Sequence, residues 1–227
     1  MGNFQVWVTF KKLLYLIIFT TLVAGSGYTT DLPIRFDHIS VKDGLTMNAV
    51  HTILEDSQGF MWFGTRFGLN RWDGREIKAF LFDPLDDTSI PGSHITALHE
   101  DVDNVMWVGS SNGGFSRYDR DNENFENFKH DPDNSNSLVS NRVTCFLTDS
   151  RGALWIGTEN GLSRYVDLTG TFTSFYPDPE NDRSLAQDRI TCMAETPGGM
   201  LWVGTENGAA TVIFLEDYSM NRRVKIR

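Results

Sequence analysis

Polar side chains recur at two positions of a repeating pattern in this chain, and their types favour the binding of a polar ligand. One position follows a phrase that contains Trp and Gly, and the other precedes a short apolar segment. Arginine, asparagine and histidine supply the directional hydrogen bonds that a sugar needs, and loops on a rigid scaffold are where recognition is usually built. The candidate ligand-binding residues are Arg66, Asn112 and Asn160 at the first position, and His94, Arg142 and Arg189 at the second.

Residue patterns typical of catalysis or of metal binding are not found. No Ser-centred elbow and no repeated loop His appears, and the five His and two Cys lack the spacing of a zinc site. The acidic segments Asp101–Asn104 and Asp131–Asn134 lack the Gly and distal Glu of a calcium loop, so we interpret them as solvated turns. His99 stands where Leu54 and Leu147 stand in other repeats, which favours a core His. We expect no enzyme activity, no cofactor and no metal.

The elements that position these residues repeat four times. An apolar pair, Trp, another apolar residue, Gly and then Thr or Ser recur around Trp62, Trp107, Trp155 and Trp202, which lie 45, 48 and 47 positions apart. A period of about 40 to 50 residues built from short strands is typical of β-propeller blades. We interpret the Trp and Gly columns as packing between blades, because a Gly in the middle of a strand marks a close approach.

Each repeat predicts four antiparallel strands. An apolar segment opens 12 residues before each Trp, turn residues follow, the Trp strand ends in a Gly-containing turn, and two further segments complete the unit. The predicted fold is therefore all-β, with a partial propeller over residues 33–227 and repeats near 48–92, 93–140, 141–187 and 188–227. Arg71, Arg117 and Arg164 share one position of the third strand, where we expect structural contacts to an Asp or to carbonyl groups.

The composition and the first residues bear on partners and location. The formal charge of −10 argues against nucleic acid and anionic membrane surfaces as partners. Residues 1–25 combine Lys11 and Lys12, an apolar run and small residues, which predicts a secretory signal peptide, with a retained signal anchor as the alternative. Both interpretations place the blades in the periplasm or otherwise outside the cytoplasm. Cys145 and Cys192 occupy equivalent places in adjacent repeats, and we expect free, buried thiols there because packed sheets lie too far apart for a disulfide.

At this point the motifs resemble a known family. The segment from Trp62 to Gly74 and its echoes resemble the two-component regulator propeller repeat, and Phe36–Leu45 resembles the usual beginning of that family. The resemblance covers about Pro33 to Gly208. It implies the extracytoplasmic sensor region of a hybrid histidine kinase or of a diguanylate cyclase, responding to a carbohydrate or other small ligand. The alternative is a secreted propeller scaffold or a relic of a carbohydrate-active enzyme.

The departures from that family lead to an expectation about closure. Relatives carry seven blades, whereas this chain supplies about four, and its fourth repeat loses the pattern after Gly208. We therefore expect an incomplete or truncated propeller. It would form either an open arc or a ring in which Ile34 to Ser40 is the fourth strand of the last blade. Bare blade faces would then favour self-association.

Overall fold

The computed structural model describes residues 34–166, 169–181, 184–206, 209–214 and 219–225, and the side chains of most of the last two segments are not described. The predicted leader, residues 1–25, lies outside this part of the chain. The chain divides into residues 1–38 and residues 39–227. In the described part of the first unit, residues 34–38, no regular secondary structure forms. Among all described residues, no helix has the length and apolar character needed to cross a membrane.

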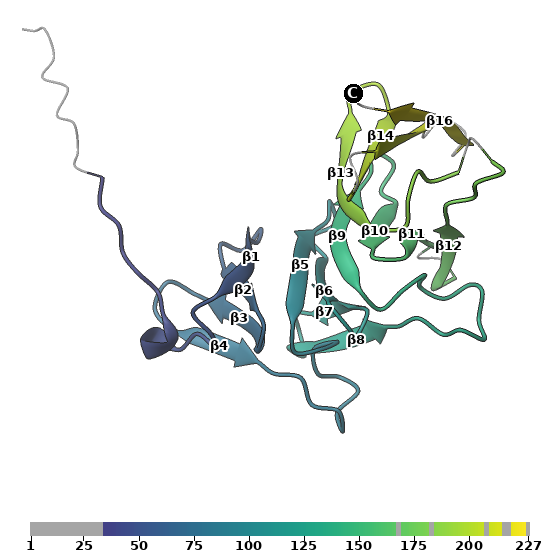
Figure 1. The fold of residues 1–227 in the computed structure, drawn as a ribbon. Helices are drawn as coiled ribbons and strands as arrows, with labels where there is room; N and C mark the ends of the chain where they lie inside the picture. Colours follow the sequence, from purple (N-terminus) through teal and green to yellow (C-terminus); the bar gives the residue numbers. More distant parts are fainter. Residues whose placement is uncertain (1–33, 167–168, 182–183, 207–208, 215–218, 226–227) are drawn as a thin grey trace, which may run out of the picture. The chain divides into compact units, whose positions relative to one another are not determined.

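The second unit consists of four four-stranded antiparallel sheets (Figure 1), which we call blades 1 to 4. In each blade the strands pair in chain order. Together with a single short 3-10 helix, η1 (Val41–Asp43), these sheets make the described unit almost entirely β. Blade 1 contains β1 (Val50–Glu55), β2 (Met61–Thr65), β3 (Gly68–Trp72) and β4 (Ile77–Phe80), and blade 2 contains β5 (Ile95–Glu100), β6 (Met106–Ser110), β7 (Phe115–Asp119) and β8 (Asn124–Phe128). Blade 3 contains β9 (Val143–Thr148), β10 (Leu154–Thr158), β11 (Gly161–Val166) and β12 (Thr171–Phe175), and blade 4 contains β13 (Ile190–Thr196), β14 (Met200–Thr205), β15 (Ala209–Phe214) and β16 (Ser219–Lys225).

The predicted fold class is confirmed: the strands form propeller blades, and the propeller is not closed. The first strands of successive blades lie next to one another, β1 against β5, β5 against β9 and β9 against β13. This order places the first strand of each blade innermost and the fourth strand outermost, as in propellers generally.

Local chemistry explains why the hairpins form where they do. Asp56 directly follows β1, and its Oδ1 accepts hydrogen bonds from the backbone N–H groups of Gln58 and Phe60. Gly59 in the same turn has φ +84°, a left-handed conformation that suits Gly. The next turn contains Gly68 at φ +129°, where a methyl group would lie 2.7 Å from the carbonyl oxygen of Phe80. Both turns therefore depend on the glycines that the sequence pattern singled out.

Mid-strand glycines receive side chains from the next blade. A methyl group on Gly64 would lie 2.7 Å from Ile95 Cγ2, and one on Gly109 would lie 2.7 Å from Val143 Cγ1. The third junction repeats this contact between Gly157 and Ile190 at 2.8 Å. Blade-to-blade packing thus explains the Gly column, as predicted.

Three apolar clusters lie at the three junctions between blades. The first joins Trp62, Leu69 and Phe80 of blade 1 to Met106 and Val108 of blade 2. Trp62 and Trp155 have no exposed surface, and only 4% of Trp107 is exposed. These three Trp side chains belong to the core, which matches the packing interpretation of the column.

The sequence allowed two arrangements, an open arc and a ring closed by residues Ile34 to Ser40 as the fourth strand of blade 4. Residues 34–40 form no strand, and β16 supplies the outer strand of blade 4 instead. Ser40 is the N-cap of η1: its hydroxyl accepts from Lys42 N, and Asp43 Oδ2 accepts from Ser40 N at 2.9 Å. The capping box competes with extended pairing at this point of the chain. The open arc, not the closure through Ile34 to Ser40, is therefore the correct expectation.

The connections between blades also tie neighbouring blades together. The loop from β4 to β5 accepts, at Thr88 O, a 2.9 Å hydrogen bond from Phe125 N on the outer strand β8. The loop from β8 to β9 repeats this bond between Asn136 O and Phe172 N, again at 2.9 Å. Each of these two loops is therefore attached to the outer strand of the following blade as well as to its inner strand.

Candidate functional site

Backbone hydrogen bonds bring the two predicted ligand-binding positions together. In blade 2, Ser111 N donates to His94 O at 3.0 Å, and in blade 3 Glu159 N donates to Arg142 O at 3.0 Å. Blade 4 repeats the bond between Glu206 N and Arg189 O at 3.2 Å. The turn after the second strand and the residue before the first strand therefore lie on the same face of the propeller, as the alternating strand direction requires.

Three of the six predicted residues line one cavity of about 360 Å³. His94, Arg142 and Arg189 come from blades 2, 3 and 4, and Glu159 joins them. The remaining lining is small and partly hydroxylic: Thr96, Ser111, Val143, Thr144, Ile190 and Thr191. The cavity thus lies at the inner rim of three blades and combines ionic groups with hydroxyl groups.

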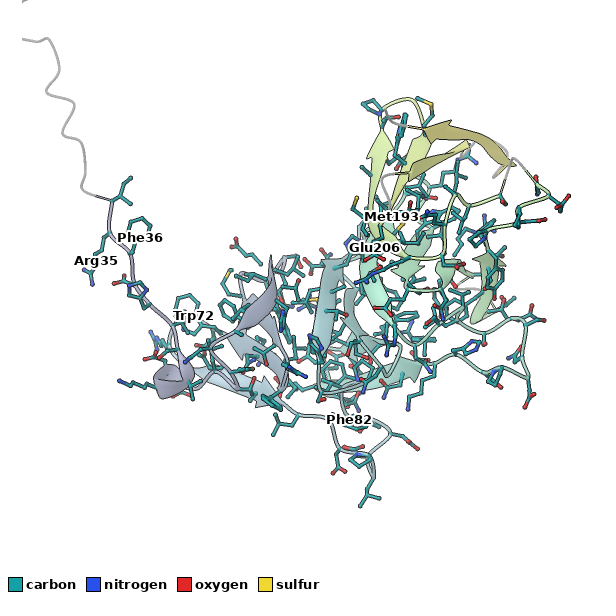
Figure 2. All side chains as sticks on the ribbon, in the orientation of Figure 1. Arg35, Phe36, Trp72, Phe82, Met193 and Glu206 are labelled. Atoms are coloured by element: carbon teal, nitrogen blue, oxygen red, sulfur yellow. The ribbon has the colours of Figure 1, made fainter. Side chains whose placement is uncertain are left out.

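The charged groups alternate along this rim. Arg142 Nη1 contacts Glu159 Oε2 at 2.8 Å, and Arg189 lies 3.8 Å from the other oxygen of Glu159. Arg189 Nη1 also contacts Glu206 Oε1 at 3.1 Å. Glu206, at the turn that follows β14, is labelled in Figure 2. These side chains are partly exposed, so each pair contributes little to stability and can exchange partners with a bound molecule.

His94 is half-buried and adds an uncharged ring to the rim. Its ring centroid lies 4.7 Å from that of His51. Burial lowers the pKa of His94, and electrostatic interactions with His51 and Arg66 lower it further. At neutral pH the ring is therefore neutral and offers one N–H donor and one acceptor. Arg66 thus acts on this site electrostatically, although it does not line the cavity.

The other two predicted residues lie elsewhere. Asn112 lines a separate cavity of about 180 Å³ together with Asn141 and Lys129. Asn160 is exposed, and its backbone N–H donates to Thr158 Oγ1 at 3.1 Å. In that turn the residue that faces the cavity is the preceding one, Glu159. Ligand binding by Asn112 and Asn160 stays a prediction.

Threonines that sequence reasoning missed form a column in the cavity. Thr96, Thr144 and Thr191 are each the second residue of a first strand, at the bulge where the pairing register shifts in all four blades. Thr96 Oγ1 donates to Val143 O at 2.7 Å, which spans two blades. The sequence does contain a pattern that could have revealed these threonines, because the dipeptide Ile-Thr or Val-Thr recurs at this position in three repeats.

The two cysteines are free, but only one is substantially buried. Burial raises the pKa of Cys145 to about 11, which makes its thiol a poor nucleophile. Cys192 is exposed, so the prediction of two buried thiols is wrong for this residue. The reason is that Cys145 faces β13 of the next blade, whereas among the described residues no further blade follows β13.

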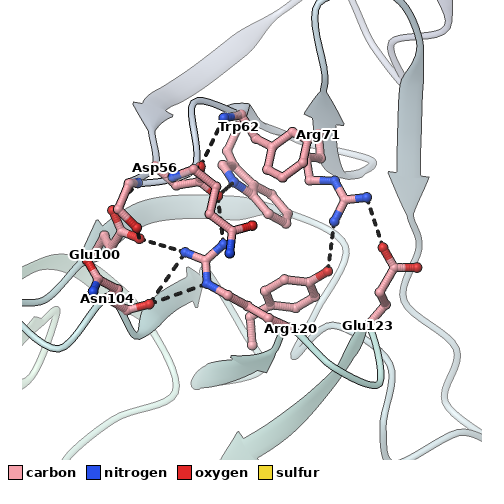
Figure 3. Close-up of polar contacts among 11 residues, drawn as sticks. Asp56, Trp62, Arg71, Glu100, Asn104, Arg120 and Glu123 are labelled. Atoms are coloured by element: carbon pink, nitrogen blue, oxygen red, sulfur yellow. Dashed lines mark hydrogen bonds and ion pairs between the residues drawn. The ribbon is translucent and has the colours of Figure 1, made fainter.

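The remaining arginines and acidic turns have structural partners. Arg71 contacts Tyr118 OH at 3.0 Å and Glu123 at 2.8 Å, so it links blade 1 to blade 2 (Figure 3). Arg117 pairs with Glu126 in its own blade, and the Arg164 guanidinium lies 6.0 Å from the centroid of Trp155. These contacts fit the structural interpretation, with Glu in place of the expected Asp.

Arg120 forms a second link between blades 1 and 2 that the sequence did not reveal. Its guanidinium contacts Asp56 Oδ2 at 2.8 Å and Glu100 Oε1 at 2.6 Å (Figure 3). Burial raises the pKa of Asp56, but hydrogen bonds from Arg120, Trp62 and the Phe60 N–H outweigh it and hold the pKa below its usual range. Asp56 is therefore an ionised structural group.

The acidic turns have partners within the turn, and His99 has a partner in the next blade. Asp101 Oδ1 accepts from the N–H groups of Asp103 and Val105, and Asp131 Oδ1 accepts from Asp133 N. His99 Nε2 lies 2.8 Å from Thr148 Oγ1. Within the described ranges, no group of three or more His, Cys, Asp or Glu side chains is arranged to hold a metal ion.

Known proteins share these features. The model of the two-component regulator propeller family matches residues 44–67, 89–112, 137–160 and 184–207. A curated relative, "Histidine kinase P4" of Formosa agariphila, is 42% identical over 55 residues, which are 24% of this chain and 4% of that protein.

Solved structures of propeller proteins are also similar to this chain. An extracellular domain described as that of a hybrid two-component system from B. thetaiotaomicron has 25% identity and a TM-score of 0.73, over 84% of this chain and 26% of that one. A virginiamycin B lyase from Staphylococcus aureus, with 17% identity and a TM-score of 0.57 over 77% of this chain and 54% of that one, shares the fold. This chain thus spans about a quarter of the sensor domain that it resembles. Each of its four blades thus carries a repeat that matches the two-component regulator propeller family, and its fold is similar to that extracellular domain.

Proposed function

We propose that this chain is part of an extracytoplasmic sensor and that the inner-rim cavity binds a neutral carbohydrate. The observation that carries the proposal is the convergence of His94, Arg142, Glu159 and Arg189 with three threonines around one cavity. Hydroxyl groups of a sugar both donate and accept hydrogen bonds, and this lining offers both kinds of partner.

The charge distribution favours a neutral ligand. The two arginines at the cavity already contact Glu159 and Glu206, and the neutral His94 adds no charge. A carboxylate ligand would have to displace a glutamate from an arginine, whereas a sugar hydroxyl can join the existing network. The cavity is a binding site in this proposal, and the chain itself performs no catalysis.

The test compares two arginine variants with a matched control. Isothermal titration calorimetry against a panel of neutral and acidic oligosaccharides should identify a neutral ligand. For that ligand Arg142→Ala and Arg189→Ala should each weaken binding about 10- to 150-fold, since a hydrogen bond to a charged group contributes about 1.5–3 kcal/mol. Arg75→Ala is the control, because Arg75 is exposed on blade 1 and does not line the cavity.

The outcomes separate the proposal from its alternatives. Unchanged affinity in both variants would exclude this cavity as the site. Binding that is lost instead by changes near Gly59 and Gly152 would place the site on the opposite face. A preference for acidic oligosaccharides would contradict the inference of a neutral ligand.

A further inference from the structure

The three junctions inside the chain are built by one repeated contact. At each junction a residue near the middle of the first strand packs against the core cluster that it shares with the preceding blade. A second residue, at the start of that strand, covers the mid-strand Gly of the preceding blade. The mid-strand residues are Leu98, Phe146 and Met193, and the residues that cover Gly are Ile95, Val143 and Ile190.

Blade 1 carries the same two residues without a described blade in front of them. Val50 corresponds to Ile95, and Ile53 corresponds to Leu98. The exposed fraction of Ile53 is 58%, and Val50, Met61 and Trp72 are half-buried. We call these four residues the blade-1 face.

Blade 4 carries the complementary half of the contact, and no further blade covers it in the described part of the chain. The nearest neighbours of Gly204 are Cys192 and Thr191 of its own blade, and Gly204 is half-buried, whereas Gly64, Gly109 and Gly157 are buried. Trp202 is half-buried too, and Cys192 and Ala194 are exposed. We call Cys192, Ala194, Trp202 and Gly204 the blade-4 face.

We propose that two copies of this chain associate head to tail, with the blade-1 face of each copy on the blade-4 face of the other. The occupant is a second copy because one chain presents both halves of a contact that it already forms three times internally. Both faces are apolar, and uncovered apolar faces favour association. Such a heterologous contact closes a ring when the rotation that relates the two copies returns the chain to its starting point. Two chains of four blades give eight blades, which is within the size range of propellers.

One detail of the internal junctions sets the strength of this contact. Glu100 accepts hydrogen bonds from Ser57 N and Oγ at 2.7 and 2.8 Å across the first junction, and Glu195 accepts the same pair from Ser150 across the third. The second junction has Val102 and Thr148 at these positions and packs without the pair.

In the proposed contact, Glu55 would face Pro197, which offers neither an N–H nor a hydroxyl group. The association is therefore apolar, resembles the second junction and can be strengthened by design. Pro197→Ser would restore both donors, and Pro197→Ala would restore the N–H alone.

The experiment measures the dimer dissociation constant of the full chain, exported to the periplasm and purified, by sedimentation velocity over a concentration series. Wild type should form a dimer. Ile53→Lys should weaken the dimer at least tenfold, whereas Leu85→Lys, at a residue that is 95% exposed in a loop, should not change it. Thermal melting of each variant, at a concentration where the chain is monomeric, checks that folding is intact. We expect Ile53→Lys to fold normally because the Ile53 side chain is exposed in the monomer.

The Pro197 variants test the register of the contact. Pro197→Ser should dimerise several-fold more tightly than Pro197→Ala, and adding Glu55→Gln to Pro197→Ser should remove most of that gain. A monomer at all concentrations, a dimer that Ile53→Lys leaves unchanged, or equal constants for Pro197→Ser and Pro197→Ala would each overturn the proposal. Open-ended oligomers in place of a dimer would overturn the closed ring.

Discussion

Trp62 donates its indole N–H to Asp56 Oδ2 at 2.9 Å, and the carboxylate that receives it also holds the turn between β1 and β2. Trp107 and Asp101 repeat this bond at 2.8 Å, as do Trp155 and Asp149. One carboxylate therefore joins the turn to the core in three blades. Blade 4 has Thr196 at the same position.

Thr196→Asp should stabilise the protein. The new carboxylate would offer acceptors to Trp202 Nε1 and to the backbone N–H groups of Gly198 and Met200, as Asp149 does in blade 3. Restoring a repeat's common residue typically gains about 0.5–2 kcal/mol in the free energy of unfolding. Chemical denaturation measures the gain, and Thr196→Asn is the uncharged control. A variant no more stable than wild type would show that blade 4 does not accept the turn of the other blades.

Gly157→Val should destabilise the fold by about 1–3 kcal/mol or more, because overpacking forces strain on a filled core. A first side-chain carbon at Gly157 would lie 2.6 Å from Cys145 Sγ and 2.8 Å from Ile190 Cγ2. Gly204→Val is the comparison, since no residue of a following blade is among the nearest neighbours of Gly204. A melting temperature unchanged in Gly157→Val would remove the argument that the Gly column serves close packing.

His99 should make stability depend on pH. Burial lowers the pKa of His99, and the opposing charges of Asp101 and Glu100 do not cancel this effect. The unfolded chain, with a His pKa of about 6.5, then binds a proton that the folded chain resists, so stability falls as the pH drops below about 6.5. His99→Leu, which copies blades 1 and 3, should show a smaller decrease in melting temperature between pH 7.5 and 5.5. An identical pH profile in the two proteins would contradict this assignment.

Arg120→Gln should weaken the junction of blades 1 and 2. The Asp56 side chain has no exposed surface, and the variant removes its charged partner while leaving the Trp62 and backbone donors. We expect a loss of about 1–3 kcal/mol, below the value for a fully buried pair because 22% of the Arg120 side chain is exposed.

Arg120→Gln should also change how the free energy of unfolding falls at acidic pH, which we call the acid limb of the stability profile. A depressed Asp pKa contributes stability above the unfolded value of about 3.9, and this contribution disappears as the pH falls through the folded pKa. Without Arg120 the folded pKa of Asp56 rises, so the loss should begin at a higher pH. Arg75→Gln serves as the charge-matched control, and equal acid limbs in the two variants would refute the role of Arg120.

The sequence predicted the blades because their determinants are local and periodic. A Gly three residues before a Trp and a Gly two residues after it fix the turn and the close approach without reference to distant residues, as Gly59 and Gly64 show. The common face of the two turn positions followed from strand direction alone, and the bond from Glu159 N to Arg142 O agrees with it.

The parts that sequence reasoning missed depend on side-chain direction and on neighbours. One step along a turn decides whether Glu159 or Asn160 faces the cavity, and no periodicity fixes that step. Equivalent positions also differ in exposure, since Cys145 meets the next blade and Cys192 does not. The capping box of Ser40 and Asp43 was readable as a short motif, but its competition with a strand was not.

The bonds from Phe125 N to Thr88 O and from Phe172 N to Asn136 O have a consequence for the order in which the chain folds. Each of these two loops contacts the blade that directly follows it, so the first two junctions are closed by segments that are near in sequence. Folding can therefore propagate from one blade to the next with small loop-closure costs, in the manner of a one-dimensional array. Unfolding begins at the outermost units of such an array. In the monomer, amide hydrogens of β6 and β10, which have neighbours on both sides, should then exchange with solvent more slowly than those of β2 and β14.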